Sequence, residues 1–236
     1  MSLLFMSVQS IKNFEEWNEL MAQKYNPDIY HRSRNPILRC IANLRVKAII
    51  DFLNVQKNDE VIEIGCGAGN ILERFNKGKL TGVDLSDFLL AIARNKLENK
   101  KVDLFKGDAE NLPAEIKNKK FDKIICSEVL EHVQHPGQVI NEILKIAHPN
   151  ATIVISIPNE KLINFLKQVL LKLKIFSIFL PNVSKKMDEE WHLHNFDLKL
   201  LNDITRGKLE MVKIKPIFGR FFPLYYVVKF KICFIH

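Results

Sequence analysis

The central part of the chain alternates short apolar runs with amphipathic segments, and this alternation constrains the fold more than any other feature. The segments between the apolar runs predict helices at Asn70–Phe75, Asp87–Leu97 and His135–Ala147. Strands that alternate with helices form right-handed βαβ units, so we expect an α/β fold with a mostly parallel, doubly wound sheet. The apolar runs predict strands at Asp59–Ile64, Lys79–Asp84, Val102–Lys106, Phe121–Cys126 and Thr152–Ile157.

Further elements flank this region on both sides. Apolar residues at helical spacing predict N-terminal helices at Ile11–Lys24 and Ile37–Leu53. After an interruption at Asn159–Glu190, the pattern predicts a helix at Asp197–Ile204 and closing strands at Leu209–Ile217 and Leu224–Ile232. No repeat or linker divides the 236 residues, so we expect one domain. Its parts are an N-terminal helical cover at 1–55, a ligand-binding core at 56–158, an insertion at 159–192 and closing elements at 193–236.

Composition bounds the class of protein and its partners. Hydrophobic residues make up 47% of the chain, enough for a sizeable buried core. The net charge of +8 favours an anionic partner such as nucleic acid or a membrane surface, although abundant lysine alone gives the same charge. The four cysteines form no C-x-x-C pair, and residues 1–10 lack a basic leader, so we expect a cytoplasmic protein. The longest uncharged run in the lipid-like region, Ile175–Ser184, is too short to cross a bilayer.

A glycine-rich turn follows the first strand of the alternating region. Its residues are Glu63, Gly65, Cys66, Gly67 and Gly69. Glycines at such a turn allow the backbone to approach a ligand closely and to present free N–H groups to it. A dinucleotide-binding dehydrogenase is the rival interpretation, but G-x-G-x-G lacks the G-x-G-x-x-G spacing of that fingerprint.

Three more polar signals follow later strands in order. Asp84 ends the second strand, where a carboxylate can accept both hydroxyls of a ribose, and Leu85 and Ser86 follow it into the same site. The alternative is that an acid or hydroxyl here caps the next helix, a role that Ser86 or Asp87 can also fill. Asp108 and Ala109 follow the third strand, and Ser127 follows the fourth at the edge where ligands bind in such sheets.

Together these four signals resemble the class I S-adenosylmethionine-dependent methyltransferases, over about Val46 to Asn159. The resemblance implies a Rossmann-like sheet of seven strands with the last one antiparallel. It also implies that Glu63 and the three glycines hold the methionine part of S-adenosylmethionine, that Asp84 holds the ribose, and that Asp108 and Ala109 hold the adenine.

The run Ser127–Val133 is the densest cluster of chemically active side chains. Glu128, Glu131 and His132 lie within one helical turn of each other, and His194 follows in a later H-x-F segment. This pattern resembles two branches of the family, the O-methyltransferases of ubiquinone biosynthesis and the small-RNA 2′-O-methyltransferases. The second branch implies that Glu128, Glu131, His132 and His194 hold a divalent, magnesium-type metal. The alternatives are that Glu131, His132 or His194 acts without a metal, with an imidazole as general base, or that the cluster merely borders the acceptor pocket.

The insertion is rich in lysine. Lys161–Lys186 contains six lysines, and a helical wheel predicts a basic amphipathic helix. The predicted apolar face consists of Leu162, Phe165, Leu166, Val169, Leu173 and Phe176. The predicted polar face consists of Lys161, Asn164, Lys167, Gln168, Lys172 and Lys174. Two interpretations stay open, a lid packed on its own domain and a lid that also contacts an anionic membrane as a peripheral surface.

The sequence therefore predicts a methyltransferase, with O-methylation of a small or lipid-like hydroxylated acceptor as the first hypothesis. An RNA 2′-O-methyltransferase is the second hypothesis. It gains from the net charge of +8 but lacks aromatic residues interleaved with the lysines. A scaffold that binds the cofactor without transferring a methyl group is the third. The acceptor atom and the oligomeric state are open at this point.

Overall fold

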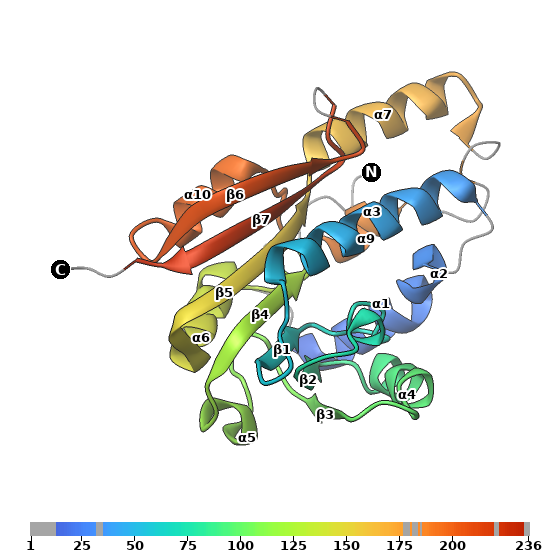
Figure 1. Ribbon diagram of the computed structural model, residues 1–236. Helices are drawn as coiled ribbons and strands as arrows, with labels where there is room; N and C mark the ends of the chain where they lie inside the picture. Colours follow the sequence, from blue (N-terminus) through green and yellow to red (C-terminus); the bar gives the residue numbers. More distant parts are fainter. Residues whose placement is uncertain are drawn as a thin grey trace.

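A seven-stranded sheet with helices on both faces forms the body of the protein (Figure 1). The computed structural model describes residues 13–31, 35–176, 180, 184, 186–219 and 222–233. Three parts of the sequence predictions lie outside the described residues. They are the segment 1–10, the start of the first predicted helix, and residues 177–179, 181–183 and 185 of the insertion.

The strand order is β3-β2-β1-β4-β5-β7-β6. The strands β1 to β5 pair in parallel, whereas β7 is antiparallel to both β5 and β6. The predicted mostly parallel sheet of seven strands is therefore confirmed. The strand bounds are β1 Glu60–Ile64, β2 Lys79–Asp84, β3 Val102–Lys106, β4 Phe121–Ser127, β5 Ala147–Pro158, β6 Leu209–Ile217 and β7 Tyr225–Ile232.

Successive residues of the central strands point to opposite faces, and each face has its own helices. On one face Val61 and Ile125 pack with Ile49 and Leu90, which come from α3 (Pro36–Leu53) and α4 (Asp87–Lys96). On the other face the neighbouring strand positions pack with α5 (Ala114–Lys117), α6 (Pro136–Ile146) and α10 (Leu198–Thr205). Near-continuous apolar strands of this kind are typical of parallel sheets buried on both sides.

The helix predicted at Asn70–Phe75 is wrong in extent. Only a short 3-10 helix, η2 at Leu72–Arg74, follows the glycine turn. The Arg74 N–H donates to the Ile71 carbonyl at 3.0 Å and the Phe75 N–H donates to the Leu72 carbonyl at 3.2 Å, whereas Lys100 Nζ donates to the Phe75 carbonyl at 2.7 Å. The helix α3 (Pro36–Leu53) covers this face of the sheet.

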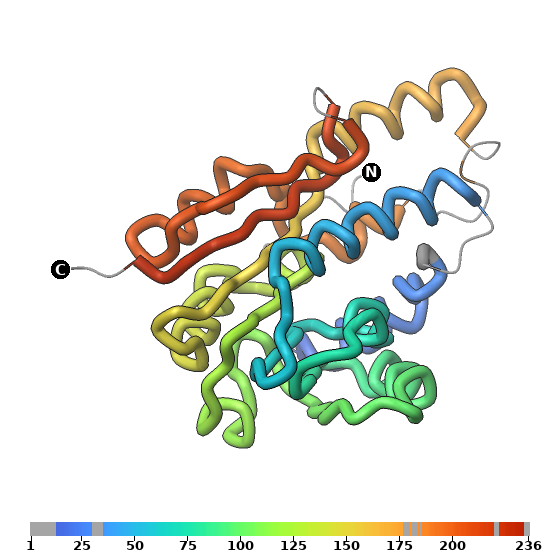
Figure 2. Tube along the Cα trace, viewed as in Figure 1, coloured from blue at the N-terminus to red at the C-terminus, as the bar shows by residue number. Residues whose placement is uncertain are grey.

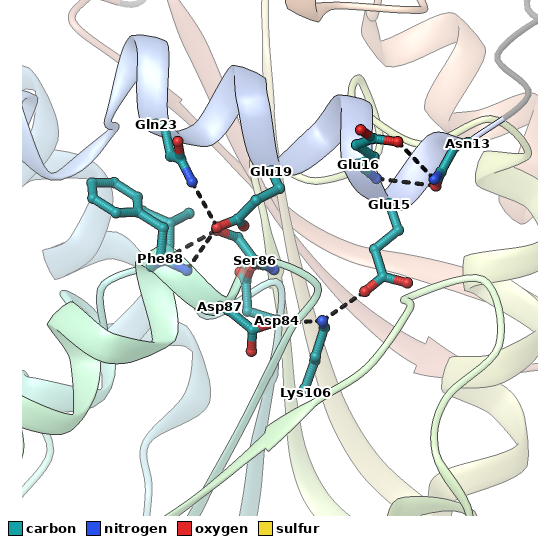
Figure 3. Close-up of polar contacts among 11 residues, drawn as sticks. Asn13, Glu15, Glu16, Glu19, Gln23, Asp84, Ser86, Asp87, Phe88 and Lys106 are labelled. Atoms are coloured by element: carbon teal, nitrogen blue, oxygen red, sulfur yellow. Dashed lines mark hydrogen bonds and ion pairs between the residues drawn. The ribbon is translucent and has the colours of Figure 1, made fainter.

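Two segments, α1 (Phe14–Tyr25) and α9 (Met187–Trp191), pack against α4. Ala22 and Tyr25 of α1 form a small core with Leu89 of α4 and Trp191 of α9. Figure 3 shows how α1 is fastened there. Glu19 Oε1 accepts from the Phe88 N–H at 3.1 Å, and Lys106 bridges Glu15 and Asp87. The helix α2 (Asp28–His31) connects this cover to α3.

The helix α7 (Glu160–Lys172) follows β5 and extends away from the strands (Figure 2). The prediction of which side chains of this helix are buried is wrong in part. Lys167, placed on the solvent face, is buried and pairs with Asp188 at 3.3 Å, whereas Phe165 and Leu173 are 63% and 61% exposed. The helix is also shorter than the lysine-rich run, because Lys174 has a positive φ of 57° and ends the helical path. Phe176, by contrast, is buried as predicted.

A glycine in β2 gives a test of this packing. A Cβ added to Gly82 would lie 2.7 Å from Leu104 Cδ2 and 2.9 Å from Cys66 Sγ. We therefore expect Gly82→Ala to reduce the free energy of unfolding by about 1–3 kcal/mol through overpacking. Chemical denaturation measures this, with Gly137→Ala in α6 as the matched control, because nothing lies within 4 Å of its added Cβ. The control should be neutral or about 0.4–1 kcal/mol more stable, since alanine restricts the unfolded chain. Equal losses in both variants would contradict the packing described for β2.

Candidate functional site

A cavity of about 440 Å³ opens at the carboxyl ends of the parallel strands. The loops after β1, β2, β3 and β4 line one part of it, and α3, α7 and α9 line the other. This is the edge at which doubly wound sheets bind ligands. These loops contain the glycine turn and the three later polar patterns found in the sequence. The fold therefore brings the four patterns together.

The glycine turn adopts a backbone that side chains would obstruct. Gly65, Gly67 and Gly69 have φ values of 69°, 50° and 76°. A Cβ on Gly65 would lie 2.2 Å from Val129 Cγ2, so this position requires glycine for space as well as for conformation. Cys66 also lines the cavity, and burial raises the pKa of its thiol well above the ordinary range, so the thiol stays protonated.

Asp84 is the centre of the hydrogen bonds at this edge. Its Oδ2 accepts from the Gly67 N–H at 2.7 Å, and its Oδ1 accepts from the Ser86 N–H at 2.9 Å. Burial raises the pKa of Asp84, and these backbone donors oppose the rise. Both carboxylate oxygens keep a lone pair free for further donors, which suits the two hydroxyls of a ribose.

The other residues predicted for the cofactor lie around Asp84. Leu85, Asp108, Ala109 and Ser127 line the cavity, whereas Ser86 is buried behind it. The Ser86 hydroxyl accepts from the Leu89 N–H at 3.2 Å, so it caps α4, the alternative role that the sequence left open. Asp108 Oδ1 accepts from the Glu110 N–H at 2.8 Å, and burial raises its pKa.

Glu63 is a buried carboxylate with an unused oxygen. It is 2% exposed and lines the cavity beside the glycine turn, and its Oε2 has no hydrogen-bond partner in the described structure. Burial raises the pKa of Glu63 well above its ordinary value, and the charge of Asp84 raises it further. An unpaired buried carboxylate is costly, so a bound cationic group with N–H donors would stabilise it. The amino group of S-adenosylmethionine fits this requirement.

The acceptor-side cluster after β4 is divided among separate partners. Glu128 has a positive φ of 56°, and its carboxylate pairs with Arg45 Nη1 at 2.9 Å and with the Ser156 hydroxyl at 2.9 Å. The Arg45 guanidinium lies 4.9 Å from the centroid of the Tyr225 ring. Glu131 is 1% exposed, and its Oε2 has no partner in the described structure. Burial, and then the charge of Glu128, raise the pKa of Glu131 well above its ordinary value.

The two predicted histidines differ in their relation to the cavity. His132 lines it, with its ring 4.5 Å from the Trp191 ring and 4.8 Å from the His192 ring, and burial lowers its pKa well below the ordinary value. His194 is not among the lining residues. Its Nε2 lies 2.9 Å from the Val133 carbonyl oxygen and 3.2 Å from that of Gln134, so it donates to the backbone.

The four side chains predicted to bind a metal do not assemble. Glu128 is paired with Arg45, and His194 Nε2 faces two carbonyl oxygens rather than Glu131. Within the described ranges no three His, Cys, Asp or Glu side chains are grouped so that they could hold a metal ion. The residues present therefore do not fit the predicted magnesium-type site, and the metal ligand set is corrected on this ground.

Sequence reasoning missed three cavity residues with charged partners. These are Arg45 with Glu128, Lys167 with Asp188, and His192 with Glu160. The pairs join residues that are far apart in the sequence and that share no motif. The only available signal was His192 itself, which stands beside His194 in the Trp191–Phe196 segment.

The sequence also matches a known family, described as a methyltransferase domain, over residues 55–208. The chain belongs to this family. The match includes every residue of the methyltransferase domain predicted to contact the cofactor, from Glu63 to Ser127.

Curated relatives of this methyltransferase domain share one description. The ubiquinone biosynthesis O-methyltransferase of Hydrogenovibrio crunogenus is 32% identical over 133 residues, which cover 55% of this chain and 54% of the relative. The mitochondrial ubiquinone biosynthesis O-methyltransferase of Dictyostelium discoideum is 28% identical over 180 residues, covering 65% of this chain and 55% of the relative. The chain thus spans about half the length of the curated relatives it matches.

Solved structures share the fold of this methyltransferase domain. The magnesium protoporphyrin IX methyltransferase of Synechocystis PCC 6803, solved with bound SAH, has a TM-score of 0.64 at 14% identity, covering 92% of this chain and 99% of that chain. The N-methyltransferase NodS of Bradyrhizobium japonicum WM9, also with SAH, has a TM-score of 0.64 at 14% identity, covering 93% and 97%. At this identity the likeness concerns the fold alone.

The hydrogen bonds of Asp84 predict the effect of removing it. Asp84→Ala should weaken binding of S-adenosylhomocysteine by about 1.5–3 kcal/mol, because bonds to a charged acceptor are lost and Gly67 loses its anchor. Isothermal titration calorimetry measures this. Asp87→Ala is the matched control, since Asp87 is exposed, pairs with Lys106 and does not line the cavity. Unchanged affinity in Asp84→Ala, or equal losses in both variants, would refute the role of Asp84.

Proposed function

We propose that this protein transfers a methyl group from S-adenosylmethionine to a hydroxyl oxygen of a small, lipid-like acceptor. The observation that carries the proposal is the composition of the cavity, in which a polar part at the glycine turn continues into an apolar part between α3 and α7. Ile41 and Leu38 of α3 and Ile163, Leu166 and Leu170 of α7 line that apolar part.

The cofactor part of the proposal rests on residues of the first part of the cavity. Glu63 and the glycine turn would hold the amino-acid end, Asp84 the ribose, and Asp108 and Ala109 the adenine. When bound, S-adenosylmethionine supplies an electrophilic methyl group on a sulfonium sulfur. The enclosing residues exclude water and align the acceptor, which is the main task of a protein in such a transfer.

The acceptor part of the proposal follows from the polar groups at the junction of the two parts. Glu131 lies there with an unused oxygen, and its raised pKa favours the protonated form, which can donate a hydrogen bond to an acceptor oxygen. His132 stays neutral because its pKa is lowered, and its ring borders the junction with Trp191. We propose that His194 holds the loop after β4 and does not contact the acceptor.

The alternatives draw less support from the cavity. An RNA 2′-O-methyltransferase needs a charged groove for a backbone, whereas aliphatic side chains of α3 and α7 dominate the acceptor part. The side chains that were to hold a metal, the feature shared with that branch, do not converge. A scaffold without transfer activity leaves the buried polar groups of the acceptor part without a ligand to satisfy them.

The outer face of α7 supports a peripheral contact with an anionic membrane. Phe165, Val169 and Leu173 form an exposed apolar stripe, with Lys172 and Lys174 exposed beside it. Phe222, 70% exposed, lies in the connection between β6 and β7, which is hydrogen-bonded to Asn159 at the start of α7. We propose that this surface rests on the lipid from which the acceptor enters. None of the helices in the described ranges is long and apolar enough to cross a bilayer.

A series of alkylcatechols tests the acceptor. With labelled S-adenosylmethionine, catechols carrying butyl, octyl and dodecyl chains should be methylated on oxygen. KM should fall as the chain lengthens, because each buried CH₂ contributes up to about 0.8 kcal/mol. Leu170→Ser should flatten this dependence, whereas the matched control Val212→Ser, at an exposed position of β6, should not. Transfer to the corresponding alkylanilines or to RNA, with none to the catechols, would refute O-methylation of a lipid-like acceptor.

Liposome flotation tests the membrane contact. Binding should require anionic lipid and weaken with salt, because each lysine near an anionic surface contributes about 1 kcal/mol within a Debye length. The double variant Phe165→Ser with Leu173→Ser should float less. Leu20→Ser in α1 is the matched control, since Leu20 is 56% exposed on another surface. No flotation on acidic liposomes at low salt, or equal loss in the control, would eliminate this contact.

A further inference from the structure

His192 and Glu160 form a buried pair on the wall of the cavity. His192 Nδ1 lies 2.8 Å from Glu160 Oε1, and their side chains are 10% and 4% exposed. Both residues line the cavity. Glu160 is the first residue of α7, and His192 directly follows α9, so the pair joins the acceptor-side helix to the segment that covers the junction.

The pair sets the tautomer of the imidazole. A carboxylate only accepts hydrogen bonds, so Nδ1 carries the proton that Glu160 accepts. The lone pair of the neutral ring is then on Nε2. Across the described residues, no side chain or backbone group forms a hydrogen bond with Nε2. A carboxylate that orients an imidazole in this way is the arrangement by which enzymes prepare a histidine to accept a proton.

A carboxylate and a second imidazole surround this ring. The groups that face it are the Glu160 carboxylate from α7 and the His132 ring from the loop after β4, 4.8 Å away. His132 stays neutral because burial lowers its pKa well below the ordinary value. Glu131 also lies near enough to Glu160 for their charges to interact, and its raised pKa favours its protonated form.

The other candidates for this task are less suitable. His132 is buried between two rings, and a second positive charge there would have no carboxylate partner. His194 uses Nε2 to hold two backbone carbonyls and does not line the cavity. The pKa of Glu131 is raised, so its protonated form is favoured and it is better suited to donate a hydrogen bond.

We propose that His192, oriented by Glu160, is the general base that removes the proton from the acceptor hydroxyl, an assignment that rests on the proposed O-methylation. The proton passes from the hydroxyl oxygen to His192 Nε2. The electron pair of that oxygen forms the new bond to the methyl carbon, and the electron pair of the breaking sulfur–carbon bond stays on sulfur. The imidazolium then releases its proton to solvent. His192 is the catalytic residue of this step, and Glu160 is a positioning residue that acts through it.

Removing the imidazole gives the first test, with octylcatechol as the acceptor. His192→Ala should lower kcat by about 10²–10⁴-fold, the usual contribution of a general base, and leave the affinity for S-adenosylhomocysteine unchanged. Added free imidazole should restore part of the rate, which a loss of structure would not allow. His148→Ala, at an exposed position outside the cavity, is the matched control and should keep full activity.

Glu160→Gln tests the positioning role. It should lower kcat with little change in KM, because the hydrogen bond keeps its length but loses its charge. In the His192→Ala background it should not affect the imidazole-rescued rate, since free imidazole does not need this partner. An equal effect of Glu160→Gln in both backgrounds would overturn its action through His192.

Two results distinguish a failure of the His192 assignment from a failure of the proposed O-methylation. If the wild-type protein methylates the catechol and His192→Ala keeps its rate, the base assignment is overturned while O-methylation stands. If the wild-type protein binds S-adenosylhomocysteine but methylates none of the catechols, the acceptor proposal falls and takes the base assignment with it.

Discussion

The carboxylate of Asp84 is the interaction on which the rest of the site depends. It accepts from the Gly67 N–H on one side and the Ser86 N–H on the other, so one buried acid joins the glycine turn after β1 to the start of α4 after β2. Parallel strands place their carboxyl ends together but do not fix the loops between them. Asp84 supplies that fixation, and its remaining lone pairs face the cavity. The same residue therefore holds the glycine turn and, in the proposed function, would also bind the ribose.

Two more buried acidic groups line the same cavity. Glu63 and Glu131 are almost completely buried, and each has one carboxylate oxygen without a partner in the described structure. Both have a pKa raised chiefly by burial, so both destabilise the folded protein when they ionise. A fold keeps such groups where a ligand satisfies them. In the proposed function, the unpaired oxygen of Glu63 would face the methyl donor. The unpaired oxygen of Glu131 would face the methyl acceptor.

The sequence predicted what depends on neighbours along the chain. Strands, the glycine turn, Asp84 and Asp108 are local patterns. Four of the five parallel strands were found near their observed bounds, whereas β5 begins at Ala147, ahead of the predicted Thr152. What it could not predict depends on partners brought close only by folding. Lys167 is buried because Asp188, 21 residues later, provides a carboxylate, and a helical wheel contains no such information. The acceptor-side residues were identified from a motif, so the sequence favoured His194 over His192, whose partner Glu160 lies 32 residues away. The segment after the glycine turn differs in another way. Leu72–Arg74 form a 3-10 helix, and helical spacing in the sequence does not distinguish its i→i+3 hydrogen bonds from those of an α-helix.

The helix α7 connects the proposals made for the two ends of the acceptor's path. Its first residue, Glu160, holds the imidazole at the junction with the cofactor part, and Lys167, nearly two turns on, is tied to Asp188 just before the same His192 segment. Its outer face carries the exposed Phe165 and Leu173. Both polar contacts thus join α7 to the segment that contains α9 and His192. The surface that would receive a lipid-like acceptor and the carboxylate that orients the proposed base are thus parts of one helix, and the ion pair of Lys167 with Asp188 ties that helix to the segment that precedes His192.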